Sequence, residues 1–388
     1  MNNIPSSRSW FAPVVPGVIM LLTAVNPLPA AEPVLKDAFR GHFLIGTAAG
    51  DAQINGRMPD RAALIARHFN ALTPENVMKW EALQPEPGRF EFAAADRCVE
   101  FAERHGMAVI GHTLVWHSQT PAWVFRGDDG GPATREQLLA RMSNHIHQVV
   151  GRYRGRVRGW DVVNEALNED GTLRQSPWLR IIGEDYLAKA FTFAHAADPA
   201  AQLYYNDYSL ENPAKRAGAV RLVKNLQAAG APIHGIGTQM HVKMDWPSPA
   251  QVDETLTAFG QLGIQVMVTE LDVDVLPTRS RDRGADVSLR LAAAPDLNPY
   301  TNGLPAEVQT ALARRYAELF EVFLKHRAVL DRVTLWGSTD GESWLNNWPI
   351  RGRTAHPLLF DRAGAPKPAF YAVIETAARH PAPPASAP

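Results

Sequence analysis

The sequence predicts an α/β protein with one domain, a (β/α)8 TIM barrel. Short apolar segments rich in β-branched residues alternate with longer segments of helical period from one end of the chain to the other. Near-continuous apolar strands indicate a parallel sheet, and eight repeats of the strand and helix unit indicate that the sheet closes on itself. A doubly wound open sheet is the alternative that the same alternation allows.

The expected strands are short apolar runs that end in polar residues. In chain order they are Phe43–Thr47, Ala71–Thr73, Ala108–Trp116, Val157–Asn164, Gln202–Asn206, Gly235–Gln239, Val266–Leu271 and Val333–Ser338.

The expected helices show apolar residues at helical spacing, and several begin after Pro or an acidic residue and end at Gly. They include Arg135–Tyr153, Asp185–Ala197, Ala214–Ala229, Ala250–Leu262 and Ala306–His326. No repeat of fixed period and no Gly/Ser-rich linker divides the chain, so residues 32–379 are expected to form one barrel domain.

Composition excludes some classes of partner. A chain of 388 residues is long enough for two domains, but α/β barrels routinely exceed 250 residues as one. With 46% hydrophobic residues, 20% charged residues and a net charge of -1, the chain can bury a large core and has no excess charge to hold a polyanion. Nucleic acid is therefore not an expected partner. A monomer is expected.

The two chain ends differ from the rest. Residues 1–31 resemble a secretory signal peptide, because Arg8 precedes the apolar stretch Val14–Val25 and small residues follow, with cleavage expected after Ala30 or Ala31. The stretch is about twelve residues long and a membrane-spanning helix needs ~20, so a permanent anchor is the less favoured alternative. We expect a secreted or periplasmic protein without a membrane span once the peptide is removed. Residues 380–388, mostly Pro and Ala, are expected to be a disordered tail.

Two internal features of the chain lie outside the regular alternation of strands and helices or bear on its stability. Cys98 is the only cysteine, so it cannot form an intrachain disulfide, and a buried thiol is expected. Residues 277–305 form a long excursion after the seventh expected strand. Because that strand ends at the C-terminal rim of the barrel, the excursion is expected to cover one side of the cleft there, with a purely structural packing loop as the alternative.

Two glutamates each lie where an apolar, β-branched run gives way to polar residues. Glu165 lies in Trp160–Ala166 (WDVVNEA) and Glu270 in Val266–Asp272 (VMVTELD). The C-terminal strand ends of a parallel barrel share one rim, so both carboxyl groups are expected to face one cavity. Hydrolysis of a glycosidic bond needs such a pair, since one group protonates the leaving oxygen and the other answers the positive charge at the anomeric carbon.

Neighbouring strand ends carry side chains of the kind that bind sugars. Polar groups pair with hydroxyls, and flat indole rings cover the apolar face of a pyranose. The candidates are Glu75, Asn76, Lys79, His112, Trp116, Asn206, Tyr208, Gln239, His241, Trp336 and Trp344. Each alone would fit ordinary packing or solvation, but packing makes no demand for polar chemistry at one rim only.

No metal and no organic cofactor is expected. His112 and His117 are five residues apart, which places them on opposite faces of a strand, and His145 and His147 diverge on a helix. No Gly-rich phosphate loop follows the first strand, and no Gly-x-Ser-x-Gly nucleophile elbow occurs.

Several strings resemble those of the endo-1,4-β-xylanases of glycoside hydrolase family 10. They are Leu72–Asn76 (LTPEN), Gly111–His117 (GHTLVWH), Trp160–Glu165 (WDVVNE), Thr269–Asp272 (TELD) and Trp336–Gly337 (WG). They occur in the family's order, and the resemblance runs from about Leu35 to about Thr376.

The resemblance implies hydrolysis of xylan and xylo-oligosaccharides by double displacement with retention, with Glu165 as general acid/base and Glu270 as nucleophile. It implies that His241 and Asp272 orient Glu270. The residues implied to bind the sugar at the cleavage point are Asn164, His112 and Gln239, with Trp336 and Trp344 covering it. Those implied for the next xylose on the non-reducing side are Glu75, Asn76 and Lys79, with Trp116 packed against the site.

One departure and two alternatives qualify this resemblance. The family commonly has Asn-Asp-Tyr-Asn after the fifth strand, whereas this chain has Asn-Asp-Tyr-Ser, with Ser209 in the last position. The shorter side chain of Ser209 puts in doubt how the leaving-group sugar is bound. A related barrel that cleaves β-1,4-glucan or mannan would share the carboxylates. A catalytically inactive carbohydrate-binding barrel is the other alternative, and the presence of both Glu165 and Glu270 argues against it.

Overall fold

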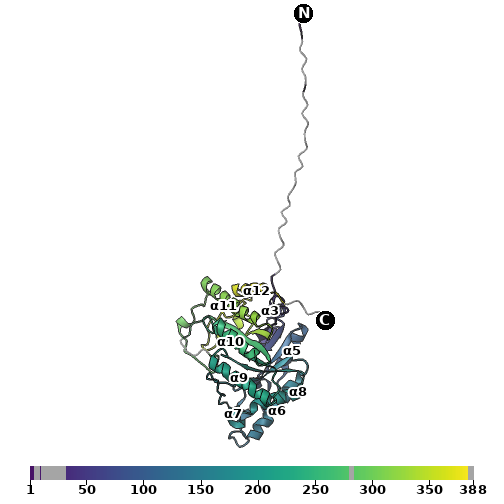
Figure 1. The fold of residues 1–388 in the computed structure, drawn as a ribbon, viewed down its shortest axis with the longest axis vertical. Coiled ribbons are helices and arrows are strands. Elements are labelled where there is room, and N and C mark those ends of the chain that lie inside the picture. Colours follow the sequence, from purple (N-terminus) through teal and green to yellow (C-terminus); the bar gives the residue numbers. More distant parts are fainter. Residues whose placement is uncertain (4–8, 10–31, 279–283, 383–388) are drawn as a thin grey trace. The chain divides into compact units, whose positions relative to one another are not determined.

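Eight parallel strands close into a barrel (Figure 1). They are β1 (Leu44–Ala49), β2 (Ala71–Pro74), β3 (Ala108–Val115), β4 (Gly159–Asn164), β5 (Gln202–Asp207), β6 (Gly235–Thr238), β8 (Gln265–Asp274) and β9 (Leu330–Leu335). Each strand pairs with the next, and β9 pairs in parallel with β1, where Val333 lies opposite Ile45. This closure confirms the expected TIM barrel and excludes the open, doubly wound sheet.

All eight expected strands exist; six agree with the expected bounds to within two residues at each end, and two differ by three residues. β8 continues to Asp274, three residues beyond the expected end, while β9 lies three residues earlier than expected. The extension of β8 pairs with a short strand that we did not expect, β7 (His241–Lys243), which places His241 opposite Asp272.

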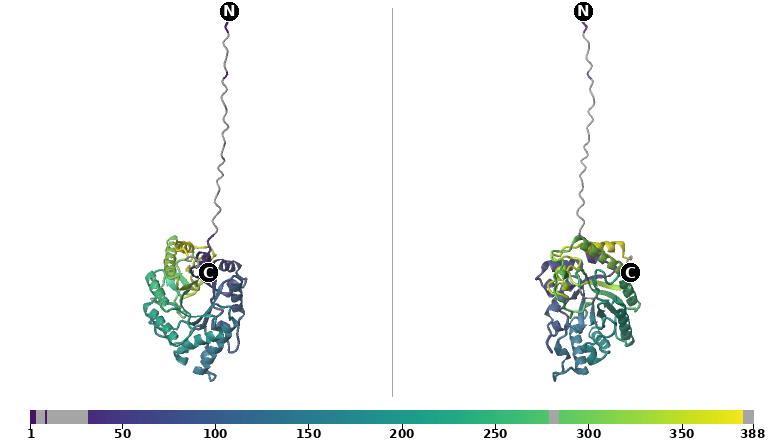
Figure 2. Two further views of the ribbon diagram at one scale, coloured as in Figure 1. Left: turned by 45° about the vertical axis from the view of Figure 1, so that its right-hand side comes forward. Right: turned by 90° about the vertical axis from the view of Figure 1, so that its left-hand side faces the viewer.

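Eight helices of ten residues or more surround the strands in the described part of the chain, as the left view of Figure 2 shows. They are α3 (Pro59–His68), α5 (Ala93–Arg104), α6 (Arg135–Arg152), α8 (Tyr186–Ala197), α9 (Pro213–Ala228), α10 (Pro249–Gly260), α11 (Ala306–Lys325) and α12 (Pro368–Arg379). The five expected helices are confirmed to within two residues at each end. Shorter helical turns are α1 (Leu35–Ala38), α2 (Asp51–Ile54), α4 (Trp80–Leu83), α7 (Pro177–Ile182), and the 3-10 turns η1 (Ala122–Phe125), η2 (Pro295–Leu297), η3 (Asp340–Glu342) and η4 (Trp344–Asn346).

Helix starts follow from local chemistry. Thr134 and Ser248 each accept a hydrogen bond from the third residue of α6 and α10, at 3.2 Å, and a glutamine side chain returns the bond to the cap. Proline occupies the first position of α9 and α10, where its missing N–H has no helical partner to lose.

The structure, a computed structural model, describes residues 1–3, 9, 32–278 and 284–382. The expected signal peptide, residues 1–31, lies almost entirely outside the described residues. The expected tail, residues 380–388, lies outside them from residue 383 onwards.

The core lies between the strands and the helices. On α11 the buried side chains are spaced three or four residues apart and include Leu312, Tyr316, Leu319 and Phe323. Full burial of a side chain of this size contributes about 1.5–3 kcal/mol. Cys98 is buried in the same core, as expected, and burial raises the pKa of its thiol to about 12.

One glycine makes a close cross-strand approach possible. Gly111 on β3 lies opposite Trp160 on β4, and a Cβ at position 111 would come within 2.1 Å of the indole. The Trp160 ring is fully buried and has no room to move. The absence of a side chain at position 111 therefore leaves room for the Trp160 ring where β3 and β4 pair, beside the strand ends that carry the site.

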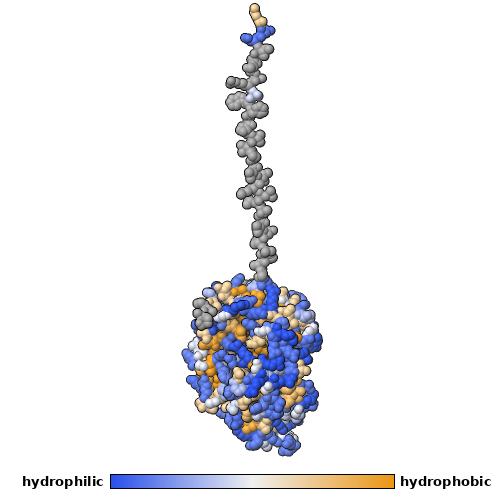
Figure 3. Space-filling model, turned by 90° about the vertical axis from the view of Figure 1, so that its right-hand side faces the viewer, coloured by the Kyte–Doolittle hydropathy of each residue, from blue (hydrophilic) through white to orange (hydrophobic). Residues whose placement is uncertain are grey.

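The surface is mixed in character. The face drawn in Figure 3 is mostly hydrophilic, with scattered apolar patches. Within the described residues, no helix combines the length and the apolar character that crossing a bilayer requires.

Candidate active site

A cavity at the C-terminal ends of the strands brings together most of the expected site residues. Its lining residues are Glu75, Asn76, Lys79, His112, Trp116, Gln119, Asn164, Glu165, Gln239, His241, Glu270, Ala285, Val287, Trp336 and Trp344. They come from six of the eight barrel strands or the loops that follow them, so the shared rim brings together residues from distant parts of the chain, as expected.

Glu165 follows β4 and is buried, with hydrogen bonds at both carboxyl oxygens. Trp116 Nε1 donates to Oε2 at 2.8 Å, and Gln239 Nε2 donates to Oε1 at 3.0 Å. Its backbone has a φ of +57°, a conformation that costs free energy in a residue with a side chain and that is enriched at functional sites. These contacts hold the carboxyl group in one orientation above the barrel.

Glu270 lies on β8 and is also buried. Asn206 Nδ2 donates to its Oε1 at 2.8 Å, and His241 Nε2 lies 3.2 Å from its Oε2. The same Asn206 amide donates to Asn164 Oδ1 at 3.0 Å, and Asn164 Nδ2 donates to Glu165 Oε1 at 3.3 Å. A continuous chain of hydrogen bonds therefore fixes the two carboxyl groups relative to each other.

The pKa values of the two carboxyl groups are shifted in opposite directions. Burial, reinforced by the negative charge of Asp207, raises the pKa of Glu165 to about 7. Burial also acts to raise the pKa of Glu270, but the hydrogen bond from His241, the nearby His112 and the Asn206 amide outweigh it and lower that pKa below its usual value. Near neutral pH the first group can hold a proton while the second is ionised, which is the division of labour that acid-assisted nucleophilic attack requires.

His241 has a raised pKa because it lies between two carboxylates. Its Nδ1 is 3.1 Å from Asp272 Oδ2, while its Nε2 faces Glu270. Burial would lower the pKa of the imidazole, but the charges of Asp272 and Glu270 and their hydrogen bonds raise it to about 10. A positively charged His241 stabilises Glu270 as an anion.

Trp336 and Trp344 border the same part of the cavity. The Trp344 indole packs on His241 with ring centroids 4.8 Å apart, and its Nε1 donates to Asp272 at 2.7 Å. The Trp336 ring meets His112 edge to face at 5.4 Å. His112 Nδ1 in turn pairs with the buried Asp161 at 2.9 Å, so its other nitrogen is left for the cavity.

Lys79 lies at the centre of a cluster of polar side chains in another part of the cavity. It is 7% exposed, and its ammonium donates to Asn76 Oδ1 at 2.9 Å and to Gln119 Oε1 at 2.8 Å. Burial lowers the pKa of Lys79 and raises that of Glu75, and each charge partly offsets the shift of the other. Gln119 was missed in the sequence because it lies in the loop after β3, outside any recognisable string.

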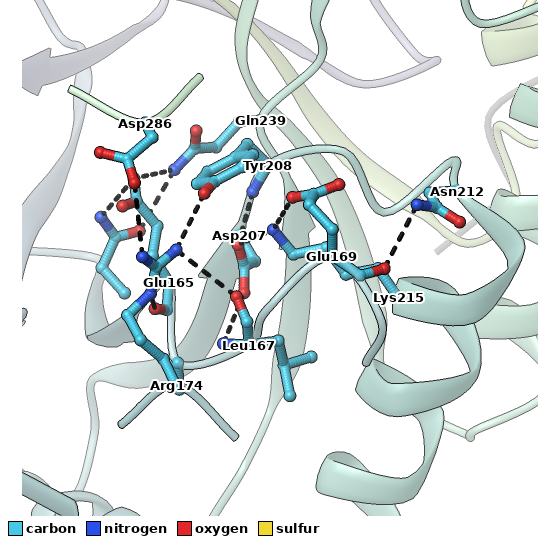
Figure 4. A network of polar contacts seen from close by, with 12 residues as sticks. Glu165, Leu167, Glu169, Arg174, Asp207, Tyr208, Asn212, Lys215, Gln239 and Asp286 are labelled. Atoms are coloured by element: carbon cyan, nitrogen blue, oxygen red, sulfur yellow. Dashed lines mark hydrogen bonds and ion pairs between the residues drawn. The ribbon is translucent and has the colours of Figure 1, made fainter. Parts of the chain in front are cut away.

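Two expected binding residues do not line the cavity. Asn206 is fully buried, and its side-chain amide contacts the Glu270 carboxylate rather than the cavity. Tyr208 is 4% exposed, and its hydroxyl accepts a hydrogen bond from Arg174 at 2.8 Å. The Lys215 ammonium lies 3.5 Å from the Tyr208 ring centroid and pairs with Asp207 at 3.0 Å (Figure 4).

The excursion reaches the cavity with its described residues. Ala285 and Val287 are part of the lining, as expected for a segment that covers one side of the cleft. Leu289 packs against a small buried apolar cluster that includes Leu276, Leu345 and Trp348. The purely structural alternative is therefore insufficient, because the segment both packs and borders the site.

Backbone strain gathers at this rim. In the described residues, positive φ angles in residues other than glycine occur at Gln119, Glu165, Ser209 and Met240. Gln119 and Glu165 line the cavity, Ser209 follows Tyr208, and Met240 lies between Gln239 and His241. Ser209 is buried there with φ +52°, a conformation in which asparagine is better tolerated than serine.

Among the residues that the structure describes, no group of three or more His, Cys, Asp or Glu side chains is arranged to hold a metal ion. His145 is buried and stacked on Trp80 at 3.7 Å, whereas His147 is exposed and bonds to Ser143, so the two diverge on α6 as expected.

The chain is similar in sequence and fold to known glycoside hydrolases. The profile described as "Glycosyl hydrolase family 10" matches residues 34–376. The chain is 43% identical over 356 residues to endo-1,4-β-xylanase A of Xylanibacter ruminicola, covering 92% of this chain and 96% of that one. It is 48% identical to a solved GH10 endoxylanase from a sugarcane soil metagenome, with a TM-score of 0.86 and coverage of 88% and 99%. A solved structure in complex with xylotriose is 36% identical, with a TM-score of 0.78 and coverage of 89% and 100%.

Proposed function

Because the chain belongs to glycosyl hydrolase family 10, a retaining family of endo-1,4-β-xylanases, we propose that Glu165 and Glu270 perform its double displacement. The enzyme is an endo-1,4-β-xylanase that acts on xylan and xylo-oligosaccharides. The single observation that carries the assignment of roles is the opposite shift of the two pKa values in one cavity.

In the first step Glu270 attacks the anomeric carbon of the bound xylose. Its lowered pKa keeps it ionised, and the positive charge of His241 lies beside its Oε2. Glu165 gives its proton to the leaving oxygen, so the shortened chain departs as a neutral alcohol. The products of this step are a covalent ester between xylose and Glu270 and a deprotonated Glu165.

In the second step water replaces the departed chain. Glu165 now accepts a proton from the water as that oxygen attacks the anomeric carbon. The ester bond to Glu270 breaks, the product keeps the β configuration, and both carboxyl groups return to their starting states. The hydrogen bonds from Trp116 and Gln239 hold Glu165 in place for both steps.

The polar group around Lys79 is suited to the second xylose on the non-reducing side. An ammonium group held by Asn76 and Gln119 can donate to sugar hydroxyls, and the neighbouring Glu75 can accept from them. A closed pocket of this kind selects against a hexose, which carries an additional CH₂OH group at C5.

A product profile tests this function. The purified enzyme is incubated with linear xylan, with xylan bearing arabinose or glucuronate branches, with cellulose and with mannan, and the products are identified by mass spectrometry. Xylo-oligosaccharides from xylan, with far slower release from the two hexose polymers, are expected. Equal release from cellulose or mannan would favour a glucanase or mannanase, and no release from any polymer would favour a carbohydrate-binding barrel.

We further propose that the protein is exported and that residues 32–379 form its catalytic unit. The support is the sequence of residues 1–31, in which Arg8 precedes an apolar stretch that ends in small residues. N-terminal sequencing of the protein from the producing cell is expected to begin at Ala31 or Glu32. A retained Met1 would contradict export by this route.

A further inference from the structure

The excursion connects two walls of the cleft through one residue, Asp286. Its carboxylate Oδ2 lies 3.5 Å from Arg174 Nη1, on the loop after β4. Its carbonyl accepts a hydrogen bond from Trp348 Nε1 at 3.0 Å, on the loop after β9. The neighbouring residues on either side, Ala285 and Val287, line the cavity between these two loops.

Arg174 links Asp286 to the acid/base residue. Its Nε donates to the backbone carbonyl of Glu165 at 3.1 Å, and its Nη2 donates to the Tyr208 hydroxyl at 2.8 Å. Figure 4 shows the Arg174 guanidinium between Asp286, Tyr208 and Glu165. Arg174 therefore joins the excursion to the backbone of the residue proposed to protonate the leaving oxygen, and this link is our reason for assigning the excursion to the leaving-group side of the cleavage point.

The other attachment is equally well defined. Trp348 stacks on Trp344 with ring centroids 4.4 Å apart, and Trp344 packs on His241 beside Glu270. The backbone N–H of Leu291 also donates to the Pro349 carbonyl at 3.0 Å. The short segment from Ala285 to Leu291 is thus fixed both beside Glu165 and beside the tryptophans that border the nucleophile.

The local conformation of the segment depends on the same side chain. Asp286 Oδ1 accepts hydrogen bonds from the Ser288 N–H at 2.9 Å and from the Ser288 hydroxyl at 2.7 Å. Burial would raise the pKa of Asp286, but the bonds from Ser288 and the charge of Arg174 lower it. One oxygen therefore shapes the segment, and the other attaches it to Arg174.

We propose that Asp286 is a positioning residue for the leaving-group subsite: its ion pair with Arg174 holds Ala285 and Val287 as the apolar wall against which the departing xylose packs. The side chains of this wall are small and apolar, which suits the unsubstituted CH and CH₂ surface of xylose. This inference rests on the proposed function, because it needs Glu165 to be the acid.

The substitution Asp286→Asn separates the two roles of the carboxylate. The amide oxygen can still accept the bonds from Ser288, while the charge that faces Arg174 is lost. KM for xylotetraose is expected to rise about two- to fivefold, the range that a partly exposed ion pair contributes, with kcat within twofold of the parent. Asp286→Glu, which keeps the charge, is expected to recover more than half of this loss.

A second substrate distinguishes leaving-group binding from general damage. Dinitrophenyl β-xylobioside places no sugar on the leaving-group side, so the loss is expected to be confined to xylotetraose. The matched control is Asp128→Asn, which removes the same charge from an 89% exposed side chain that lies 3.7 Å from Arg141 and is not part of the cavity lining.

The outcomes separate this inference from the function beneath it. A parent enzyme without activity on xylotetraose would contradict the proposed function itself. An active parent with an Asp286→Asn variant of unchanged KM, or with equal losses on both substrates, would overturn the positioning role and leave the function standing. A thermal melt of each variant shows whether an equal loss comes from unfolding.

Discussion

Raising the pH should inactivate the enzyme through a single group, Glu165. It must carry a proton to act as a general acid, and its pKa of about 7 means that about half of the molecules lack that proton at pH 7. At pH 8 about one tenth remain protonated, so kcat/KM for xylotriose is expected to be about tenfold lower than at pH 6. The acid side of the profile belongs to Glu270, whose lowered pKa keeps it ionised until the pH falls below the usual range of a glutamate.

The assay compares two substrates across the same pH range. Xylotriose needs a proton on its leaving oxygen, whereas the dinitrophenolate released from dinitrophenyl β-xylobioside does not. The loss of kcat/KM above pH 7 is expected for xylotriose only, with both substrates measured where the enzyme stays folded. An alkaline loss of equal size on both substrates, or a xylotriose midpoint below about pH 5.5, would refute the assignment of Glu165 as the acid with a raised pKa.

Three further perturbations test the roles of individual residues. Glu270→Ala should abolish turnover of every substrate, whereas Glu165→Ala should keep slow activity on aryl xylosides. Azide should rescue the Glu165→Ala variant, because a small anion needs no general base. Equal inactivity of both variants would contradict these roles. Lys79→Ala should lower kcat/KM on xylotriose by roughly tenfold or more, with a smaller loss on long xylan, since loss of a hydrogen bond to a charged group costs ~1.5–3 kcal/mol; an undiminished xylotriose rate would remove Lys79 from substrate binding. The raised pKa of Glu165 favours the folded state fully below about pH 4.5, and this contribution is lost as the pH rises through about 7. Between pH 5 and pH 8 the unfolding free energy of the parent, measured by urea denaturation, should therefore fall by up to ~3 kcal/mol relative to that of Glu165→Gln. Parallel dependence of the two unfolding free energies on pH would contradict the raised pKa.

The architecture could be predicted because hydrophobic periodicity repeats along the whole chain. Each barrel strand is buried on both faces and so forms an apolar run, and the alternation with helices leaves few topologies open. The strand β7 was missed because it has three residues, His241–Lys243, of which only Val242 is apolar. Its pairing with β8 depends on the extension of that strand beyond Leu271, which the sequence does not mark.

The site could be predicted where a residue lies in an expected strand or directly after it. Glu165 and Gln239 directly follow β4 and β6, Glu270 lies within β8, and all three face the cavity. Gln119 reaches the cavity from a loop and follows no period, so the sequence did not single it out, and for Val287 the sequence predicted only that residues 277–305 cover one side of the cleft.

The contacts among the site residues could not be predicted from the sequence, for a different reason. Burial of Asn206 and its bond to Glu270 depend on side-chain packing between strands, which no pattern within one strand specifies. The pKa of Glu165 depends on the same packing, because burial is its largest cause.

The central claim is that Glu270 forms a covalent bond to xylose. The most direct test is incubation with a 2-deoxy-2-fluoro-β-xylobioside that carries a dinitrophenolate leaving group, because the fluorine slows both steps and the good leaving group restores the first. Mass spectrometry of the intact protein is expected to show one added fluoroxylobiosyl group, and peptide mapping is expected to place it on Glu270. A label on any other residue, or no accumulating adduct while the substrate is still hydrolysed, would contradict the double displacement proposed here.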